Sequence, residues 1–212
     1  MKYKFIITLL CLAPLTGMLA GCASHAPSAA MLMNSHKDKA SVGLSAALGW
    51  GGSYNYSDGD INYKEEGMNA FEIPLIMRTE YFLVSASLEM PMALRVNLGF
   101  VCDYVGVLGW AAPFSVGEEH EAGYGGMLVE QYPITENIKI GLNEFFANNQ
   151  YTGSEYLGEV GRSWYPKGYK EIGVGIYAIY KEFSFEFRYE NELNSANNRY
   201  RFMASYIHSF QI

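Results

Sequence analysis

Apolar and polar residues alternate with a period of two along most of the chain from Ser41 onward. In the stretch 183–190, Phe, Phe, Phe and Tyr form one face, while Ser, Glu, Arg and Glu form the other. The stretches 71–80 and 172–180 repeat this alternation. A period of two is typical of a β-strand whose two faces meet different surroundings. Because no comparable helical period occurs, the pattern predicts an all-β fold.

Turn-forming residues separate the alternating stretches and allow the strands to be counted. Ten strands are predicted, at about 41–50, 69–78, 81–89, 93–102, 104–111, 121–131, 137–147, 169–180, 183–190 and 199–212. The count falls to eight if the weaker strands between 93 and 131 merge. Two long polar loops are expected, at 51–69 and around 148–168. We therefore predict one domain over 41–212, a single antiparallel up-and-down β-barrel of 8–10 strands.

Alternation alone does not say which face points inward. In a transmembrane barrel the apolar face meets lipid and the polar face lines the lumen. In a soluble barrel such as a lipocalin, the apolar face encloses the core or ligand cavity and the polar face meets water. The two arrangements imply different kinds of protein, and charge and aromatic content differ between them.

Charge and aromatic content favour the transmembrane arrangement. Charged residues make up only 17% of the chain, whereas a water-facing β surface carries more charge. Aromatic residues gather at predicted strand ends, including Trp50, Trp110 and Trp164, as expected at a lipid–water boundary. The polar face holds acids and bases that could pair across strands and fill a narrow lumen. This predicted lumen charge network comprises Glu72, Arg78, Glu80, Glu89, Arg95, Glu186, Arg188, Glu190 and Arg201.

The last thirteen residues end in alternating hydrophobic positions that include Phe202, Tyr206 and Phe210. This segment resembles the closing strand of bacterial outer-membrane β-barrel proteins. The resemblance implies that the barrel-assembly machinery reads this strand and inserts the chain into the outer membrane. Two departures are that the final residue is Ile212 rather than Phe and that His208 interrupts the apolar face.

The N-terminus has the three parts of an export signal: two lysines, a short apolar run and a cleavage site. The site, Leu19-Ala20-Gly21-Cys22, resembles the lipobox of bacterial lipoproteins. That resemblance implies that export and lipidation machinery cleave between Gly21 and Cys22 and attach diacylglycerol to the cysteine sulfur. We therefore expect a signal peptide over 1–21 and a lipidated, flexible tether over 22–40, with its histidines solvated.

One observation favours a lipid-tethered soluble barrel instead. Lipoproteins usually reach the outer membrane on a carrier for soluble folded proteins, whereas transmembrane barrels use the assembly machinery. A chain that carries both signals is unusual. The lipocalin-like alternative, with a small apolar ligand in its cavity, therefore stays open.

Composition and motifs limit the chemistry that the protein could perform. An excess of 22 acids over 15 bases argues against a nucleic-acid partner. No catalytic motif, cofactor motif or metal-binding motif is found, and the acidic cluster 118–121 is expected to be a solvated loop. The last hairpin is faintly similar to that of the lipid A deacylases, but it lacks their His-x-Ser pair. Because His208 and Ser209 are adjacent in a strand, they point to opposite faces.

Together these features predict a lipid-anchored β-barrel of the bacterial outer membrane that contacts the lipid bilayer. Its expected role is structural or interactional and not enzymatic. The alternatives are the tethered lipocalin-like module and an outer-membrane lipid hydrolase.

Overall fold

The computed structural model describes residues 25–57, 60–65, 70–90, 93–115, 123–156, 162–193 and 198–211. Eleven strands form one sheet in these residues. They are β1 (Lys39–Ser57), β2 (Asp60–Glu65), β3 (Ala70–Arg78), β4 (Phe82–Met90), β5 (Ala93–Val101), β6 (Val105–Ser115), β7 (Gly123–Pro133), β8 (Ile138–Tyr156), β9 (Arg162–Tyr180), β10 (Phe183–Glu192) and β11 (Asn198–Phe210). One short helix, α2 (Ala29–Met33), precedes them.

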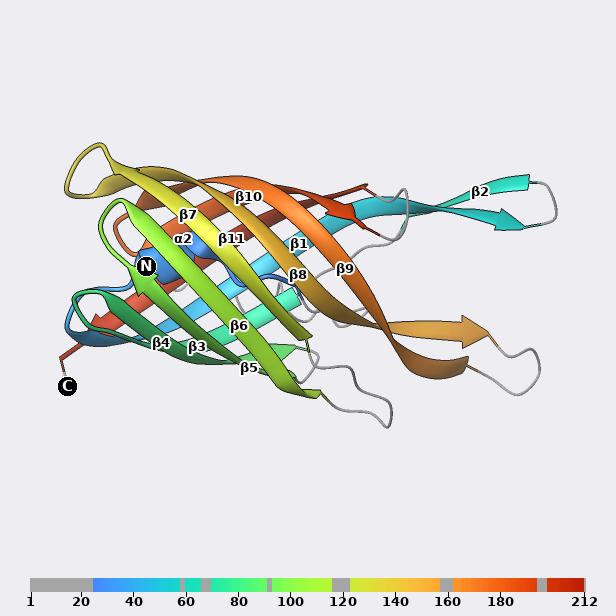
Figure 1. Ribbon diagram of the computed structural model, residues 1–212, viewed down its shortest axis with the longest axis horizontal. Coiled ribbons are helices and arrows are strands. Elements are labelled where there is room, and N and C mark those ends of the chain that lie inside the picture. Colours follow the sequence, from blue (N-terminus) through green and yellow to red (C-terminus); the bar gives the residue numbers. More distant parts are fainter. Residues whose placement is uncertain are drawn as a thin grey trace, which may run out of the picture.

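The sheet closes on itself as a ten-stranded antiparallel barrel (Figure 1). From β3 to β11, consecutive strands pair with one another. The ring is closed by β1, which pairs with β3 on one side and with β11 on the other, in register from Ala40↔Phe210 to Gly52↔Asn198. Strand β2 pairs only with the far part of β1 and extends it as a hairpin. The predicted all-β, up-and-down barrel with ten strands is therefore confirmed.

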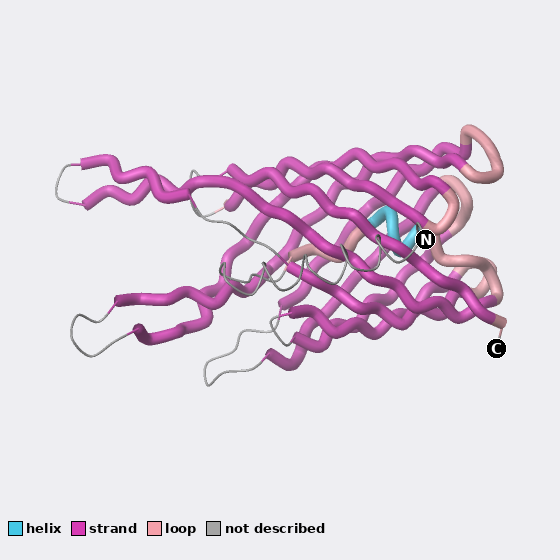
Figure 2. The backbone as a smooth tube through the Cα atoms, turned by 180° about the vertical axis from the view of Figure 1, so that it is seen from behind, coloured by secondary structure: helices cyan, strands magenta, loops and turns pink. Residues whose placement is uncertain are grey.

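The two ends of the barrel differ. At one end, here called the short-turn end, tight connections at 79–81, 102–104, 134–137 and 181–182 join the strands. At the other, the long-loop end, the β1–β2 and β8–β9 hairpins project beyond their neighbours (Figures 1 and 2). Strand β8 follows β9 as far as Tyr156↔Arg162, whereas its pairing with β7 ends at Asn148. Parts of the predicted loops 51–69 and 148–168 are therefore strand, because paired strands continue past the rim.

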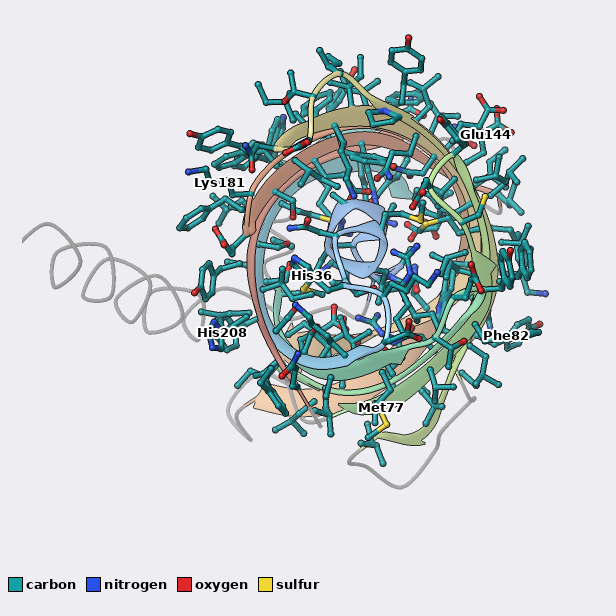
Figure 3. All side chains as sticks on the ribbon, turned by 90° about the vertical axis from the view of Figure 1, so that its left-hand side faces the viewer. His36, Met77, Phe82, Glu144, Lys181 and His208 are labelled. Carbon is teal, nitrogen blue, oxygen red and sulfur yellow. The ribbon has the colours of Figure 1, made fainter. Side chains whose placement is uncertain are left out.

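The barrel has its polar face inside and its apolar face outside. In β10, Ser184, Glu186, Arg188 and Glu190 are buried while Phe185, Phe187 and Tyr189 are exposed on the outer surface. The outer surface carries apolar side chains on every barrel strand, as Met77 and Phe82 illustrate in the end-on view (Figure 3). The lipocalin-like alternative required the opposite arrangement, with the apolar face enclosing a cavity. The structure therefore excludes that alternative.

Candidate functional site: a plugged lumen

The lumen is filled by the chain's own N-terminal segment, residues 25–35, here called the plug. Every residue of the plug is buried, and all five residues of α2 are completely inaccessible. Figure 3 shows the helix end-on at the centre of the ring of strands. For these residues the structure differs from the flexible, solvated tether expected over 22–40, and His25 is buried rather than solvated.

The physical reason is that the plug fits the lumen in both polarity and shape. Near the short-turn end the inward side chains are apolar and pack around α2, among them Ile76, Leu83, Val129 and Ile207. A helix that is apolar on all sides is stable only where apolar surface surrounds it. Toward the long-loop end the inward side chains are charged, and they bind the backbone of residues 25–27 and the hydroxyl of Ser28.

Arg188 and Glu186 hold the middle of the plug. The Arg188 guanidinium donates to the carbonyl oxygens of Ala26 (2.8 Å) and Pro27 (2.6 Å) and pairs with Glu186 through Nε (2.6 Å). Glu186 in turn accepts from the Ser28 hydroxyl (2.9 Å) and from the backbone N–H of Ala30 (3.2 Å). This carboxylate lies at the N-terminus of α2, where the first N–H groups have no partner within the helix. The two residues thus pair with one another and hydrogen-bond four residues of the plug, Ala26, Pro27, Ser28 and Ala30.

A second buried group holds the start of the plug. Arg95 lies 2.6 Å from Glu72 and 3.3 Å from Glu89 in two ion pairs, and it also donates to the carbonyl oxygen of His25. Glu89 accepts from the backbone N–H of His25 (3.1 Å) and lies 3.0 Å from its Nδ1. All four side chains are at most 1% exposed. Buried charges are tolerated when they are paired and hydrogen-bonded, and here the plug supplies part of that pairing.

The remaining predicted network residues occupy three other places. Glu190 and Arg201 form a bidentate pair (2.8 and 3.0 Å). Arg78 lies at the short-turn end and donates to the carbonyl oxygens of Met33 and Ser35, so it holds the end of the plug. Glu80 lies outside the lumen, because it belongs to the turn after β3, and it pairs on the surface with Lys37 (2.8 Å). Its placement in the lumen network was wrong.

Several lumen residues were not predicted from the sequence. Glu171 is completely buried and accepts from Asn149, while Arg199 pairs with Glu192 (2.8 Å). Trp110 was expected in an aromatic girdle but points inward and lies over Gly125, which leaves room for its ring. Trp50 does lie on the outer surface, against Phe187 and Tyr200.

The short-turn end brings together a serine and a histidine. Ser209 Oγ lies 2.8 Å from His36 Nδ1 and 2.7 Å from Ser41 Oγ. Burial, followed by the nearby Lys39 and Lys139, lowers the pKa of His36. Acyl transfer also needs a group that orients the base and donors for the oxyanion. Within the described part of the chain no carboxylate is hydrogen-bonded to His36, although Glu182 lies near enough to act on the ring electrostatically.

Among the described residues no group of three or more His, Cys, Asp or Glu side chains could hold a metal ion. The acidic cluster 118–121 and the lipobox residues Gly21 and Cys22 lie outside the described residues. None of the described helices is long and apolar enough to cross a membrane.

No protein-family model matches the chain, and no curated protein matches it. Solved structures that are similar to this chain include the following three. For Neisserial surface protein A the identity is 12% and the TM-score 0.44, over 81% of this chain and 97% of that one. For the N-terminal β-barrel domain of Pseudomonas aeruginosa OprF the values are 8% and 0.39, over 81% and 98%. For Ail, the attachment invasion locus protein of Yersinia pestis, they are 12% and 0.36, over 82% and 100%.

Proposed function

We propose that this protein is a closed β-barrel of the bacterial outer membrane that serves as a structural or surface-interaction scaffold and not as a pore. The observation that carries the proposal is the plug. Eleven consecutive residues occupy the lumen, and charged side chains of the wall bind them from the long-loop end to the short-turn end. A ten-stranded barrel is narrow enough for side chains to fill it, and this one holds a segment of backbone as well.

The outer surface supports insertion into a bilayer. Exposed apolar side chains cover all ten barrel strands, which is far more than the single apolar patch of a few hundred Å² found on soluble monomers. A closed barrel leaves no unpaired strand edge, as the hydrocarbon interior requires. The bilayer is therefore the proposed partner of this surface, and barrel-assembly machinery that reads β11 is the proposed route of insertion.

The interaction role is proposed for the long-loop end. Barrels of this class have short periplasmic turns and longer extracellular loops, so the projecting β1–β2 and β8–β9 hairpins would face the outside of the cell. Paired strands that continue past the rim hold a surface in place better than free loops do, because their backbone hydrogen bonds are satisfied.

Lipid attachment at Cys22 is the further part of the proposal, and it rests on the four lipobox positions in the sequence. Its test is incorporation of an alkyne-labelled fatty acid by expressing cells, with the Cys22→Ser variant as control. Label on the native chain and none on the variant would support lipidation. Equal labelling of the two would contradict it.

The pore question is tested by conductance in planar bilayers. The full-length protein should insert without a steady ion current, because the plug closes the lumen. A variant that lacks residues 25–35 serves as the positive control, provided that it still shows the heat-dependent gel shift of a folded barrel. A steady current through the full-length protein would overturn the proposal.

A further inference from the structure

A pocket opens at the short-turn end, where the chain leaves the plug and enters β1. Its volume is about 460 Å³, within the range of about 300–1,000 Å³ that is usual for small-molecule sites. The buried Asn34 and Ser35, at the end of the plug, line its inner part, and short turns between strands form its rim. Figure 3 looks onto this end and shows His36, which also lines the pocket, inside the ring of strands. The pocket therefore faces water on one side and the plug on the other.

Two cations extend into this pocket from opposite sides of the barrel. Arg78 is the last residue of β3 and Lys139 the second residue of β8, and these strands lie five apart in the ring of ten. Both side chains are on the inward face of their strands, and they lie near enough to repel each other. Two like charges held together away from bulk water are costly. An anion bound between them would lower that cost.

Both cations keep donors that the described part of the chain leaves unused. Arg78 Nη1 donates to the carbonyl oxygens of Met33 (3.3 Å) and Ser35 (2.9 Å), but its Nε is buried without a hydrogen-bond partner. The Lys139 ammonium group makes no hydrogen bond or ion pair with any described residue. Asp103 acts electrostatically on both cations, so the two share this carboxylate. The inner part of the pocket is thus positive and has donors for the acceptors of a ligand.

The acids of the pocket lie further out than these cations. Asp103, Glu136 and Glu182 are exposed in turns at the rim. By contrast, Arg78 is only 7% exposed and Lys139 is half-buried. Charge is therefore arranged by depth, with positive groups inside and negative groups at the rim.

Two lysines at the rim do not cancel its negative charge. Lys37 forms an ion pair with Glu80 (2.8 Å), which does not line the pocket. Lys181 Nζ lies 5.6 Å from the centre of the Tyr180 ring. Glu136 and Glu182 still outnumber Lys181, so the rim stays negative.

A ligand with a carboxylate at one end and an ammonium group at the other matches this order of charges. Guanidinium and ammonium groups bind carboxylates through short, charge-assisted hydrogen bonds. We propose that the pocket binds a small zwitterion, an amino acid or a dipeptide, with its carboxylate between Arg78 and Lys139 and its amino group beside Glu136 and Glu182. This site goes beyond the proposed scaffold role. Because the short turns of such barrels face the periplasm, the ligand enters from that side.

The test is an NMR titration of the isotope-labelled, full-length protein in detergent micelles with three forms of one dipeptide. Dialanine carries both charges, N-acetyl-dialanine only the carboxylate, and dialanine amide only the ammonium group. We expect dialanine to shift the amide signals of residues around the pocket, and each capped form to bind at least about tenfold more weakly. The N-acetyl form also represents the C-terminus of a longer chain. Equal binding of dialanine and its N-acetyl form, or no shift with dialanine, would overturn the proposal.

A lysine substitution tests whether the inner cations hold the carboxylate. Lys139→Met should weaken dialanine binding about tenfold, whereas Lys139→Arg should retain it because the charge is kept. The matched control is Lys39→Met, which removes another half-buried lysine at the same end but outside the pocket, and it should bind like the native protein. Unchanged binding in Lys139→Met, or an equal loss in Lys39→Met, would overturn the assignment.

A substitution of the rim acids tests the site for the amino group. The double variant Glu136→Gln/Glu182→Gln changes only exposed side chains, so it tests the proposal even if Lys139→Met does not fold. It should bind dialanine and N-acetyl-dialanine equally, because the partner of the amino group is lost. A preference for dialanine as strong as in the native protein would refute the role of these acids. Each variant is first checked for the heat-dependent gel shift of a folded barrel.

Discussion

Arg188 should be the side chain whose loss most weakens the hold on the plug, and Arg188→Met tests this. The substitution keeps an unbranched chain but removes three hydrogen bonds, two to plug carbonyl oxygens and one to Glu186. It leaves Glu186 buried without its cation. Breaking a buried pair by removing one partner typically costs about 3–5 kcal/mol. This range already includes part of the cost of leaving the two plug carbonyl groups without a donor. We therefore expect a loss of about 4 kcal/mol in the free energy of unfolding.

The assay is urea unfolding of the protein refolded into lipid vesicles, followed by tryptophan fluorescence. The matched control is Lys37→Met, which breaks an ion pair whose side chains are about half exposed, 52% and 56%, and which should leave the unfolding curve unchanged. The double variant Arg188→Met/Glu186→Leu should lose less stability than the sum of the two single variants, because the orphaned charge is also removed. A loss below about 1 kcal/mol for Arg188→Met, the size of an exposed pair, would refute the reasoning.

Three further outcomes follow from the wall of the barrel. Gly125→Ala should cost roughly 1–3 kcal/mol in the same urea assay, because its Cβ would overlap the Trp110 ring and the carbonyl oxygen of Phe146. The control is Gly109→Ala, whose added Cβ would lie 3.7 Å from its nearest neighbour. Equal losses of stability in the two variants would contradict the packing described. Glu144 is exposed on the outer face (Figure 3), so Glu144→Leu should stabilise the vesicle-inserted protein by roughly 1 kcal/mol, and destabilisation would argue against a lipid-facing position. The pKa of His36 is lowered in the folded protein, so the unfolded state binds its proton first as the pH falls through the ordinary value of about 6.5. The free energy of unfolding should therefore decline below that pH, and it should decline less steeply in His36→Gln. Identical slopes for the two proteins would show that His36 does not contribute.

The fold could be predicted because its main determinant is local. Alternation with a period of two identifies each strand from its own residues, and turn residues separate neighbours, so the ten strands and their order follow from the sequence. The inward face could not be decided by the same pattern, because alternation looks identical in a lipid-facing barrel and in a soluble one. Low charge and paired acids and bases indicated the answer only in combination.

The plug could not be predicted from its own residues. Ala29–Met33 spans five residues and is apolar throughout, so it has neither the length nor the one-sided pattern of a surface helix. A signal did exist in the strands. Near the short-turn end both faces are apolar, as in Ile76-Met77 and Leu83-Val84, and inward apolar residues in a narrow barrel require an apolar filling.

Pairing within the lumen depended on geometry that the sequence does not contain. Which acid meets which base is decided by register and by the stagger between strands. Arg188 lies directly opposite Arg201 on the neighbouring strand, and two cations repel each other. Arg188 instead pairs with Glu186 on its own strand, and Arg201 pairs with Glu190. His25 also belongs to this network, although it lies in the plug, where the sequence has no strand pattern.

The central claim, a closed barrel that spans the outer membrane with its apolar face in lipid, is tested most directly by one gel. Outer membranes from expressing cells are washed with urea, and the protein is run with and without boiling. The account predicts that the protein stays in the membrane pellet and that its mobility changes on heating. Release of the Cys22→Ser variant into the soluble fraction, without a heat-dependent shift, would contradict it.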